Sequence, residues 1–196
     1  MKKIFLVLLL FLSFNVGYSQ EIKKVKNDIF EVHYSEDLEQ PIWLKYRSTN
    51  RPKNVSRTGL DFYTEPGIKT SDNKDYEKNV YDKGHIAPAA TFSDNMENLK
   101  QTFSYLNCVL QHEKLNRGQW GDLEDQERKW DDEEPLTIYV NVIFDDEVKR
   151  LPTNAAIPSH FEKHIYFEEK KEWKCFLFPN ETPKFVWIKY QINCKH

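Results

Sequence analysis

The chain has 196 residues and a formal net charge of −3, with 39% hydrophobic and 14% aromatic residues. At roughly 150 residues per domain, this length excludes a large multidomain protein. The apolar content is too high for a disordered chain. The negative net charge argues against a uniformly basic, nucleic-acid-coating surface, although it is compatible with a local basic groove.

The first residues have the pattern of a secretory signal peptide. Lys2 and Lys3 precede the apolar run Ile4–Phe14, and the tripeptide Gly17-Tyr18-Ser19 provides a small-x-small cleavage site. The run has about half the length that a membrane span needs. We therefore expect a signal peptide at residues 1–19 and a secreted or periplasmic mature chain, residues 20–196, that forms one domain and has no membrane association after cleavage.

Short runs rich in Val, Ile, Phe, Tyr or Trp predict seven β-strands along the mature chain. They are Ile29–Tyr34, Ile42–Tyr46, Phe103–Leu110, Leu136–Phe144, Phe161–Phe167, Trp173–Phe178 and Phe185–Ile192. The segment Thr49–Val80 between the second and third runs is polar, carries Gly59 and Gly67, and lacks periodicity. It predicts a long loop, and long loops in compact domains are often functional.

Two helices are predicted between the strands. The shorter one covers Asp94–Gln101, where Asp94 followed three residues later by Glu97 is typical of a capping box. Because strands dominate and helices lie between them, the sequence indicates an α+β fold with a mixed or antiparallel sheet core.

The longer predicted helix is Leu115–Trp130. Trp120, Leu123 and Glu127 fall on one face of it at helical spacing. Beside that face, Glu124 and Arg128 have the i,i+4 spacing of an ion pair. The same 16-residue stretch therefore presents one buried face and one charged edge.

Three cysteines, Cys108, Cys175 and Cys194, occur in a chain expected to reach an oxidising compartment. One disulfide and one remaining thiol is the simplest arrangement, and a Cys175–Cys194 bridge would pin the C-terminus. Three free thiols remain the alternative, because connectivity cannot be deduced from sequence. The absence of a C-x-x-C spacing argues against a thiolate zinc site.

The segment Asp82-Lys83-Gly84-His85 precedes Pro88, which stops a helix, and its glycine permits a tight backbone turn. These features predict that His85 lies at the edge of a strand or loop. A histidine there can serve as a general base near neutral pH. Taken alone, a histidine in a loop is more often a surface or hydrogen-bonded structural residue.

Two downstream motifs favour the catalytic interpretation. The chain continues with Leu106-Asn107-Cys108-Val109-Leu110-Gln111 and then with Leu115-Asn116-Arg117-Gly118-Gln119-Trp120, followed by Leu123-Glu124. Together with the histidine motif, residues 81–130 resemble the DNA/RNA non-specific endonuclease family. The ββα-metal finger of that family carries a D-R-G-H signature and an N-x-G-x-W-x-x-L-E helix.

The resemblance implies an endonuclease that hydrolyses phosphodiester bonds in DNA and RNA. It implies that His85 activates the attacking water and that Asn116 is the single protein ligand of Mg²⁺, with Mn²⁺ as an alternative, since both ions accept hard oxygen ligands. The helix glutamate, Glu124, would order metal-bound waters. The remaining matched residues would hold phosphate or shape the site: Arg57, Arg128, Asp82, Asn107 and Gln111.

One position departs from the family pattern, because Lys83 stands where the family has arginine. Lysine is a cation but cannot form the planar bidentate fork to phosphate. The alternative function is therefore a catalytically impaired ββα-finger protein that binds nucleic acid. The sequence leaves the oligomeric state open.

Overall fold

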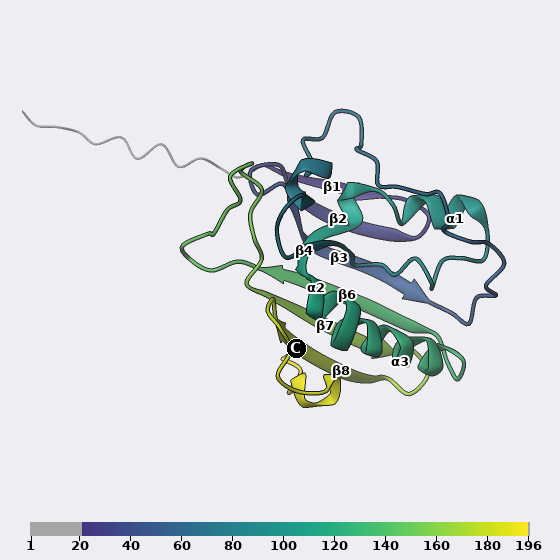
Figure 1. Cartoon of the computed structure of the whole chain (residues 1–196). Helices are drawn as coiled ribbons and strands as arrows, with labels where there is room; N and C mark the ends of the chain where they lie inside the picture. Colours follow the sequence, from purple (N-terminus) through teal and green to yellow (C-terminus); the bar gives the residue numbers. More distant parts are fainter. Residues whose placement is uncertain (1–20, 196) are drawn as a thin grey trace, which may run out of the picture.

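The computed structural model describes residues 21–195, so the predicted signal peptide at residues 1–19 lies outside the described residues. Seven strands form one sheet, in which every neighbouring pair is antiparallel (Figure 1). In spatial order they are β1 (Ile22–Lys26), β2 (Phe30–Ser35), β3 (Gln40–Ser48), β6 (Leu136–Ile143), β7 (His160–Phe167), β8 (Glu172–Pro179) and β9 (Gln191–Ile192). The antiparallel option within the predicted α+β class is confirmed.

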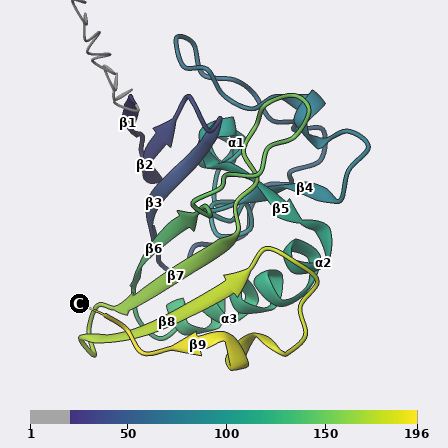
Figure 2. The same cartoon turned by 90° about the vertical axis from the view of Figure 1, so that its left-hand side faces the viewer.

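A second, two-stranded sheet pairs β4 (Tyr81–His85) with β5 (Cys108–His112). It is followed directly by helix α2 (Glu113–Leu115), the π-helical turn η3 (Asn116–Trp120) and helix α3 (Gly121–Asp131). Helix α1 (Met96–Gln101) lies between β4 and β5 in the chain. Figure 2 shows the three α-helices and the β4–β5 pair on one side of the large sheet. Two strands and the helix that follows them thus form a ββα unit.

Three short 3₁₀ turns complete the described elements. They are η1 (Asn73–Tyr76), η2 (Tyr105–Asn107) and η4 (Trp187–Tyr190). The predicted loop at residues 49–80 is confirmed as irregular apart from η1 and a single bridge between Tyr63 and Ser104. Within residues 21–195, no helix is long and apolar enough to cross a bilayer.

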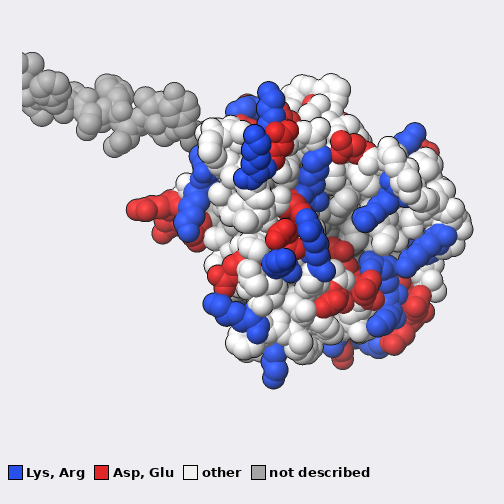
Figure 3. Space-filling view, in the orientation of Figure 1, with Lys and Arg blue, Asp and Glu red and all other residues white. Residues whose placement is uncertain are grey.

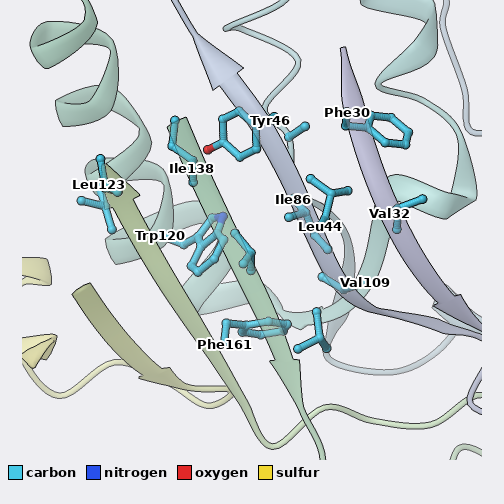
Figure 4. Close-up of a cluster of buried hydrophobic side chains, with 14 of the residues drawn as sticks. Phe30, Val32, Leu44, Tyr46, Ile86, Val109, Trp120, Leu123, Ile138 and Phe161 are labelled. Atoms are coloured by element: carbon cyan, nitrogen blue, oxygen red, sulfur yellow. The ribbon is translucent and has the colours of Figure 1, made fainter. Parts of the chain in front are cut away.

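The main core lies between the large sheet and the ββα unit. Alternate residues of β6 are buried, as expected for a strand with one covered face. Figure 4 shows strand residues such as Leu44, Ile138 and Phe161 in the same cluster as Trp120 and Leu123. The Trp120 ring meets that of Phe161 at 5.6 Å between centroids. Burial of these apolar side chains holds the ββα unit on the sheet.

A buried ion pair lies beneath the same helix. Lys163 Nζ of β7 is 2.7 Å from Glu127 Oε1 of α3, and both side chains are almost fully buried. The hydroxyl of Tyr46 donates to the other carboxylate oxygen of Glu127 at 2.7 Å. The Lys163 ammonium also lies 4.1 Å from the centre of the Trp120 ring. The predicted shared face of Trp120, Leu123 and Glu127 is therefore confirmed as the buried face.

Three strands differ from the sequence prediction. The predicted strand Phe103–Leu110 begins only at Cys108, because the Ser104 side chain accepts a hydrogen bond from the Leu106 amide and caps the turn η2. The predicted strand Phe185–Ile192 is mostly η4, with only Gln191–Ile192 paired to β8. Strand β1 was not predicted, because three of its five residues are lysines and its two apolar residues, Ile22 and Val25, do not alternate.

The predicted helix Leu115–Trp130 is broken rather than continuous. Gly118 has φ −115° and ψ −114°, which are non-helical values, and it separates α2 from α3. Its charged edge also differs from the prediction, because Arg128 pairs with Asp125 at i,i+3 instead of with Glu124. A carboxylate one residue closer to the arginine and more exposed is the easier partner to reach.

The predicted capping box of the shorter helix is wrong by one residue. Asn95 is the N-cap of α1, and its side chain accepts a hydrogen bond from the Asn98 amide at 2.8 Å. Asp94 instead accepts from the Asn98 side chain and from Arg51. Asp94 is drawn to Arg51 of the long loop, a partner that is distant in the chain and that the local sequence does not reveal.

The predicted disulfide is confirmed. Cys175 of β8 is bonded to Cys194, with 5.3 Å between their Cα atoms, and it pins the C-terminal segment to the sheet. The third cysteine, Cys108, is a buried free thiol. Burial raises the pKa of Cys108 well above that of an exposed thiol, so the residue is neutral and packs as an apolar side chain.

We expect the substitution Lys163→Met to lower the free energy of unfolding by about 3–5 kcal/mol, because it leaves Glu127 buried without its partner. Denaturant unfolding followed by circular dichroism measures the change. The double variant Lys163→Met/Glu127→Gln should recover part of the loss. The control is Lys184→Met, whose exposed ion pair with Glu181 is worth less than about 1 kcal/mol. Equal effects of Lys163→Met and the control would contradict the structural role of the buried pair.

Candidate functional site

His85 is the last residue of β4 and pairs with Cys108 of β5, which confirms its predicted place at a strand edge. Its ring packs against Phe62 from the long loop, at 4.7 Å between centroids, and against Phe103, at 5.0 Å. The Nε2 atom is buried and has no hydrogen-bond partner among residues 21–195. The imidazole is thus held by aromatic packing with one ring nitrogen unused.

The surroundings of His85 keep it uncharged. Burial, followed by the positive charge of Arg57, lowers the pKa of His85 from 6.5 to about 3. The ring is therefore neutral at physiological pH, which is the form that can accept a proton. Arg57 lies in the long loop and is exposed, yet its charge reaches the histidine. The fold thus brings together two residues that are 28 positions apart.

Asn116 begins η3, and its side-chain amide is oriented by β4. Its Nδ2 donates to Asp82 Oδ2 at 2.9 Å. Because the nitrogen is engaged, the Oδ1 oxygen remains available to accept a hydrogen bond or coordinate a cation. Arg117 forms a fork to the same carboxylate, with Nε–Oδ2 at 2.8 Å and Nη2–Oδ1 at 2.5 Å. Asp82 therefore joins the strand to the helix at the site.

Asp82 is ionised, which suits its role in orienting the Asn116 amide. Burial favours its neutral form, but hydrogen bonds from Arg117 and then Asn116 outweigh burial and lower the pKa of Asp82 below its usual range. The carboxylate is ionised at neutral pH and can accept all of these hydrogen bonds at once. It fixes which atom of the Asn116 amide points away from the strand.

The available donors fit a mostly hydrated divalent cation. Within residues 21–195, no group of three or more His, Cys, Asp or Glu side chains could enclose a metal ion. The oriented Oδ1 atom of Asn116 is a hard, neutral oxygen ligand, which suits Mg²⁺ or Mn²⁺. Mg²⁺ commonly keeps several waters and takes few protein ligands. Asn116 therefore fits the single-ligand role that the sequence resemblance implies.

Glu124 and Arg128 lie on successive turns of α3. Burial raises the pKa of Glu124 from 4.5 to about 7, and the positive charge of Lys163 offsets this only in part. The Nη1 atom of Arg128 is buried without a hydrogen-bond partner among the described residues. The helix thus presents a carboxyl group that titrates near neutrality and a guanidinium group with unused donor capacity.

Lys83 is already bound by side chains of the long loop. Its ammonium is 2.8 Å from Asp61 Oδ1 and also donates to the Asn73 side chain. It lies 5.6 Å from the centre of the Phe62 ring. Because successive residues of a strand point to opposite faces, Lys83 and His85 share one face of β4, and both contact Phe62. A protein carboxylate already neutralises Lys83.

Gly84 and Asn107 fix the backbone around the histidine. A Cβ atom on Gly84 would lie 2.5 Å from Gln111 Oε1, so glycine is required here by close packing, and not by the tight turn that the sequence analysis expected. Gln111 itself is buried, and its amide has no partner among residues 21–195. The Asn107 side chain exchanges hydrogen bonds with both backbone groups of Ala87, at 2.7 and 2.9 Å. It holds the segment that follows His85.

Comparison with known proteins identifies the family. Residues 12–196 match the family model described as DNA/RNA non-specific endonuclease. The chain belongs to this family. It is 30% identical over 159 residues to a nuclease of Serratia marcescens, which covers 72% of this chain and 59% of that protein. It is 26% identical over 149 residues to the mitochondrial endonuclease G of Bos taurus, which covers 64% of this chain and 48% of the relative.

A solved structure shows the same fold. A chain in the crystal structure of the EndoG/EndoGI complex superposes with a TM-score of 0.78 at 21% identity, covering 87% of this chain and 80% of that chain. At this identity the likeness concerns the fold alone. The chain spans about three fifths or less of the length of the two curated relatives.

Residues of the long loop were missed as site components by the sequence analysis. Phe62 packs on His85, while Asp61 and Asn73 bind Lys83. Arg51 bonds to Asp94. The loop has no periodicity or motif that could mark these positions, so the only signal was its length and polarity. In this family member, the loop supplies one wall of the site.

We expect Glu124→Gln to stabilise the metal-free protein at pH 8 by about 3 kcal/mol, since the pKa of Glu124 is raised by about 2.5 units and one unit corresponds to about 1.4 kcal/mol. The folded-state pKa of about 7 exceeds the ordinary 4.5. The folded chain therefore holds a proton that the unfolded chain releases between these values, so stability falls as pH rises through this window. Thermal unfolding in EDTA at pH 4 and pH 8 tests this expectation, with the exposed Glu172→Gln as control. A gain at pH 4 equal to that at pH 8 would contradict the assignment.

Proposed function

We propose that this protein is a metal-dependent endonuclease that hydrolyses phosphodiester bonds of DNA and RNA with little sequence preference. The observation that carries the proposal is the neutral His85, whose buried Nε2 atom is unpartnered among the described residues. It lies on the strand whose Asp82 orients the Asn116 amide. A general base and a cation ligand on one ββα unit support phosphodiester hydrolysis.

The site residues have distinct roles in this proposal. His85 accepts the proton of the attacking water through its neutral imidazole. The oxygen of Asn116 holds Mg²⁺, or Mn²⁺ in its place. When bound, the ion supplies positive charge that stabilises the phosphorane-like transition state and the leaving oxygen. Glu124 orders water around the ion. Arg57 and Arg128 hold the phosphate, while Lys83 neutralises Asp61 beside it.

Sequence-independent cutting follows from the kind of contacts that these residues can make. Guanidinium groups and a hydrated cation bind phosphate, which carries no base information. Lys and Arg side chains are interspersed with Asp and Glu on the face shown in Figure 3. This mixture favours a narrow phosphate-binding path over a broad basic coat. We further propose a secreted or periplasmic enzyme whose residues 20–196 act as one endonuclease domain.

The alternative function is a nucleic-acid-binding protein with impaired catalysis. The observation in its favour is the engagement of Lys83 by Asp61 and Asn73, which leaves its charge partly satisfied. A cation already paired with a carboxylate stabilises developing charge on phosphate less well. Binding would persist in this case, because the arginines remain.

The decisive experiment is cleavage by the purified mature protein. We expect loss of both supercoiled plasmid and single-stranded RNA in Mg²⁺ and no loss in EDTA. His85→Ala should lower the cleavage rate by roughly 10²–10⁴-fold, because a general base contributes about this much. Gel electrophoresis of the products over time measures the rate.

A matched control keeps this result interpretable. His33→Ala removes a histidine of β2 and should leave cleavage unchanged. Circular dichroism confirms that both variants fold. Wild-type cleavage by the His85→Ala protein would refute the proposed mechanism. Intact substrates with retained binding of both nucleic acids would favour the alternative function.

The metal role has its own test. Asp82→Asn should raise the Mg²⁺ concentration for half-maximal cleavage by about 10–100-fold, which is the usual effect of losing the partner of a metal ligand. The physical reason is that an asparagine at position 82 no longer dictates which amide atom of Asn116 faces the ion. Glu97→Gln, at an exposed position of α1, is the control. An unchanged metal requirement would remove Asp82 from this role.

A further inference from the structure

A cavity of about 380 Å³ opens where α3 ends against the long loop. Its lining comes from three places: the loop at Asn50, Arg51 and Lys53, the segment after His85 at Ala90 and Thr91, and the helix from Asp125 to Asp132. Arg128 belongs to this lining and to the site described above. The cavity is therefore continuous with the proposed phosphate-binding side of the site.

Two guanidinium groups in this lining have unused donors. Arg51 Nη1 binds Asp94 Oδ2 at 3.1 Å, but Arg51 Nε is buried without a partner among residues 21–195. Arg128 binds Asp125, and its Nη1 atom is likewise buried without a hydrogen-bond partner among residues 21–195. Buried donors of charged groups are normally hydrogen-bonded. Both side chains line the same cavity, so an anion bound there would lie next to two guanidinium groups.

The orientation of Arg51 is fixed by its neighbours. Its guanidinium lies 5.3 Å from the centre of the Phe92 ring, and Asp94 holds one edge of the group. A planar guanidinium that is stacked on one face and bonded at one edge presents its remaining N–H groups in a defined direction. Such a group suits a tetrahedral oxyanion such as phosphate.

The carboxylates in the lining do not make it a cation site. Asp125 is paired with Arg128. Asp131 accepts a hydrogen bond from Ser48, and burial raises its pKa above the usual range. The lining also carries Lys53 and Lys129. The lining therefore carries four cationic side chains against three carboxylates, although the chain as a whole is negative.

We propose that this cavity is a subsite for a non-scissile backbone phosphate of the bound nucleic acid, with Arg51 as its principal ligand and Lys53 as a secondary cation. The inference rests on the proposed function, because it extends the path of the same strand. Arg128 is one turn beyond Glu124 on α3, about 6 Å at 1.5 Å per residue. The cavity therefore adjoins the site along the same helix.

The test compares binding and turnover of a single-stranded 20-nucleotide DNA. The variant Arg51→Gln removes the charge but can still donate to Asp94. In EDTA, fluorescence anisotropy should show about tenfold weaker binding, and the slope of log affinity against log salt should fall by about 0.7, the value for one lost phosphate contact on a single strand. In Mg²⁺, KM should rise about tenfold while kcat stays within twofold, because this phosphate does not react. Lys24→Gln, on exposed β1, is the matched control.

Each outcome has a distinct meaning. An unchanged salt slope and KM in a cleaving, folded Arg51→Gln protein would overturn the subsite. A fall in kcat without a change in binding would also overturn it, because Arg51 would then act at the reacting phosphate. If wild-type protein neither binds nor cuts the oligonucleotide, the proposed function itself fails. If Arg51→Gln does not fold, Lys53→Gln replaces it, with about threefold weaker binding and the same fall in slope expected.

Discussion

The site depends on how α3 is anchored to the large sheet. Glu127 of this helix is buried between Lys163 and Tyr46, and the Lys163 ammonium also faces the Trp120 ring. An ion pair at this depth is strongly directional, since neither charge has water as a substitute partner. It therefore fixes both the rotation and the position of the helix. Asn116 precedes this anchored segment, so its place relative to the strands depends on it.

A second constraint joins the helix to the β4–β5 pair. Asp82 accepts hydrogen bonds from Asn116 and Arg117 at the start of the helical segment. The Asn107 side chain holds the backbone that follows His85, because it accepts a hydrogen bond from the Ala87 amide. The two candidate reactive groups are thus held by separate strand residues on one small sheet. A site of this kind is preorganised, because each group is supported by partners that do not themselves react.

Two groups of the candidate site have strongly shifted pKa values. Burial makes His85 a neutral base and brings the pKa of Glu124 to about 7, and both groups are less stable in their ordinary charged forms than they would be in water. Titratable groups with strongly shifted pKa values cluster at functional sites more often than elsewhere. The proposed phosphate subsite has a related character, because Arg51 and Arg128 keep buried donors without a partner among the described residues, which costs stability.

The sequence by itself determined the features that local pattern controls. The helix face of Trp120, Leu123 and Glu127, the strand position of His85 and the family were predictable, because spacing and motif carry them. The Cys175–Cys194 bridge was one of two arrangements that the sequence left open. Only the tertiary structure decided the break at Gly118 and the contacts of the loop at residues 49–80. The physical reason is that these contacts join residues far apart in the chain. Asp61 reaches Lys83, Arg51 reaches Asp94, and no periodicity records which distant partner a polar loop residue will meet.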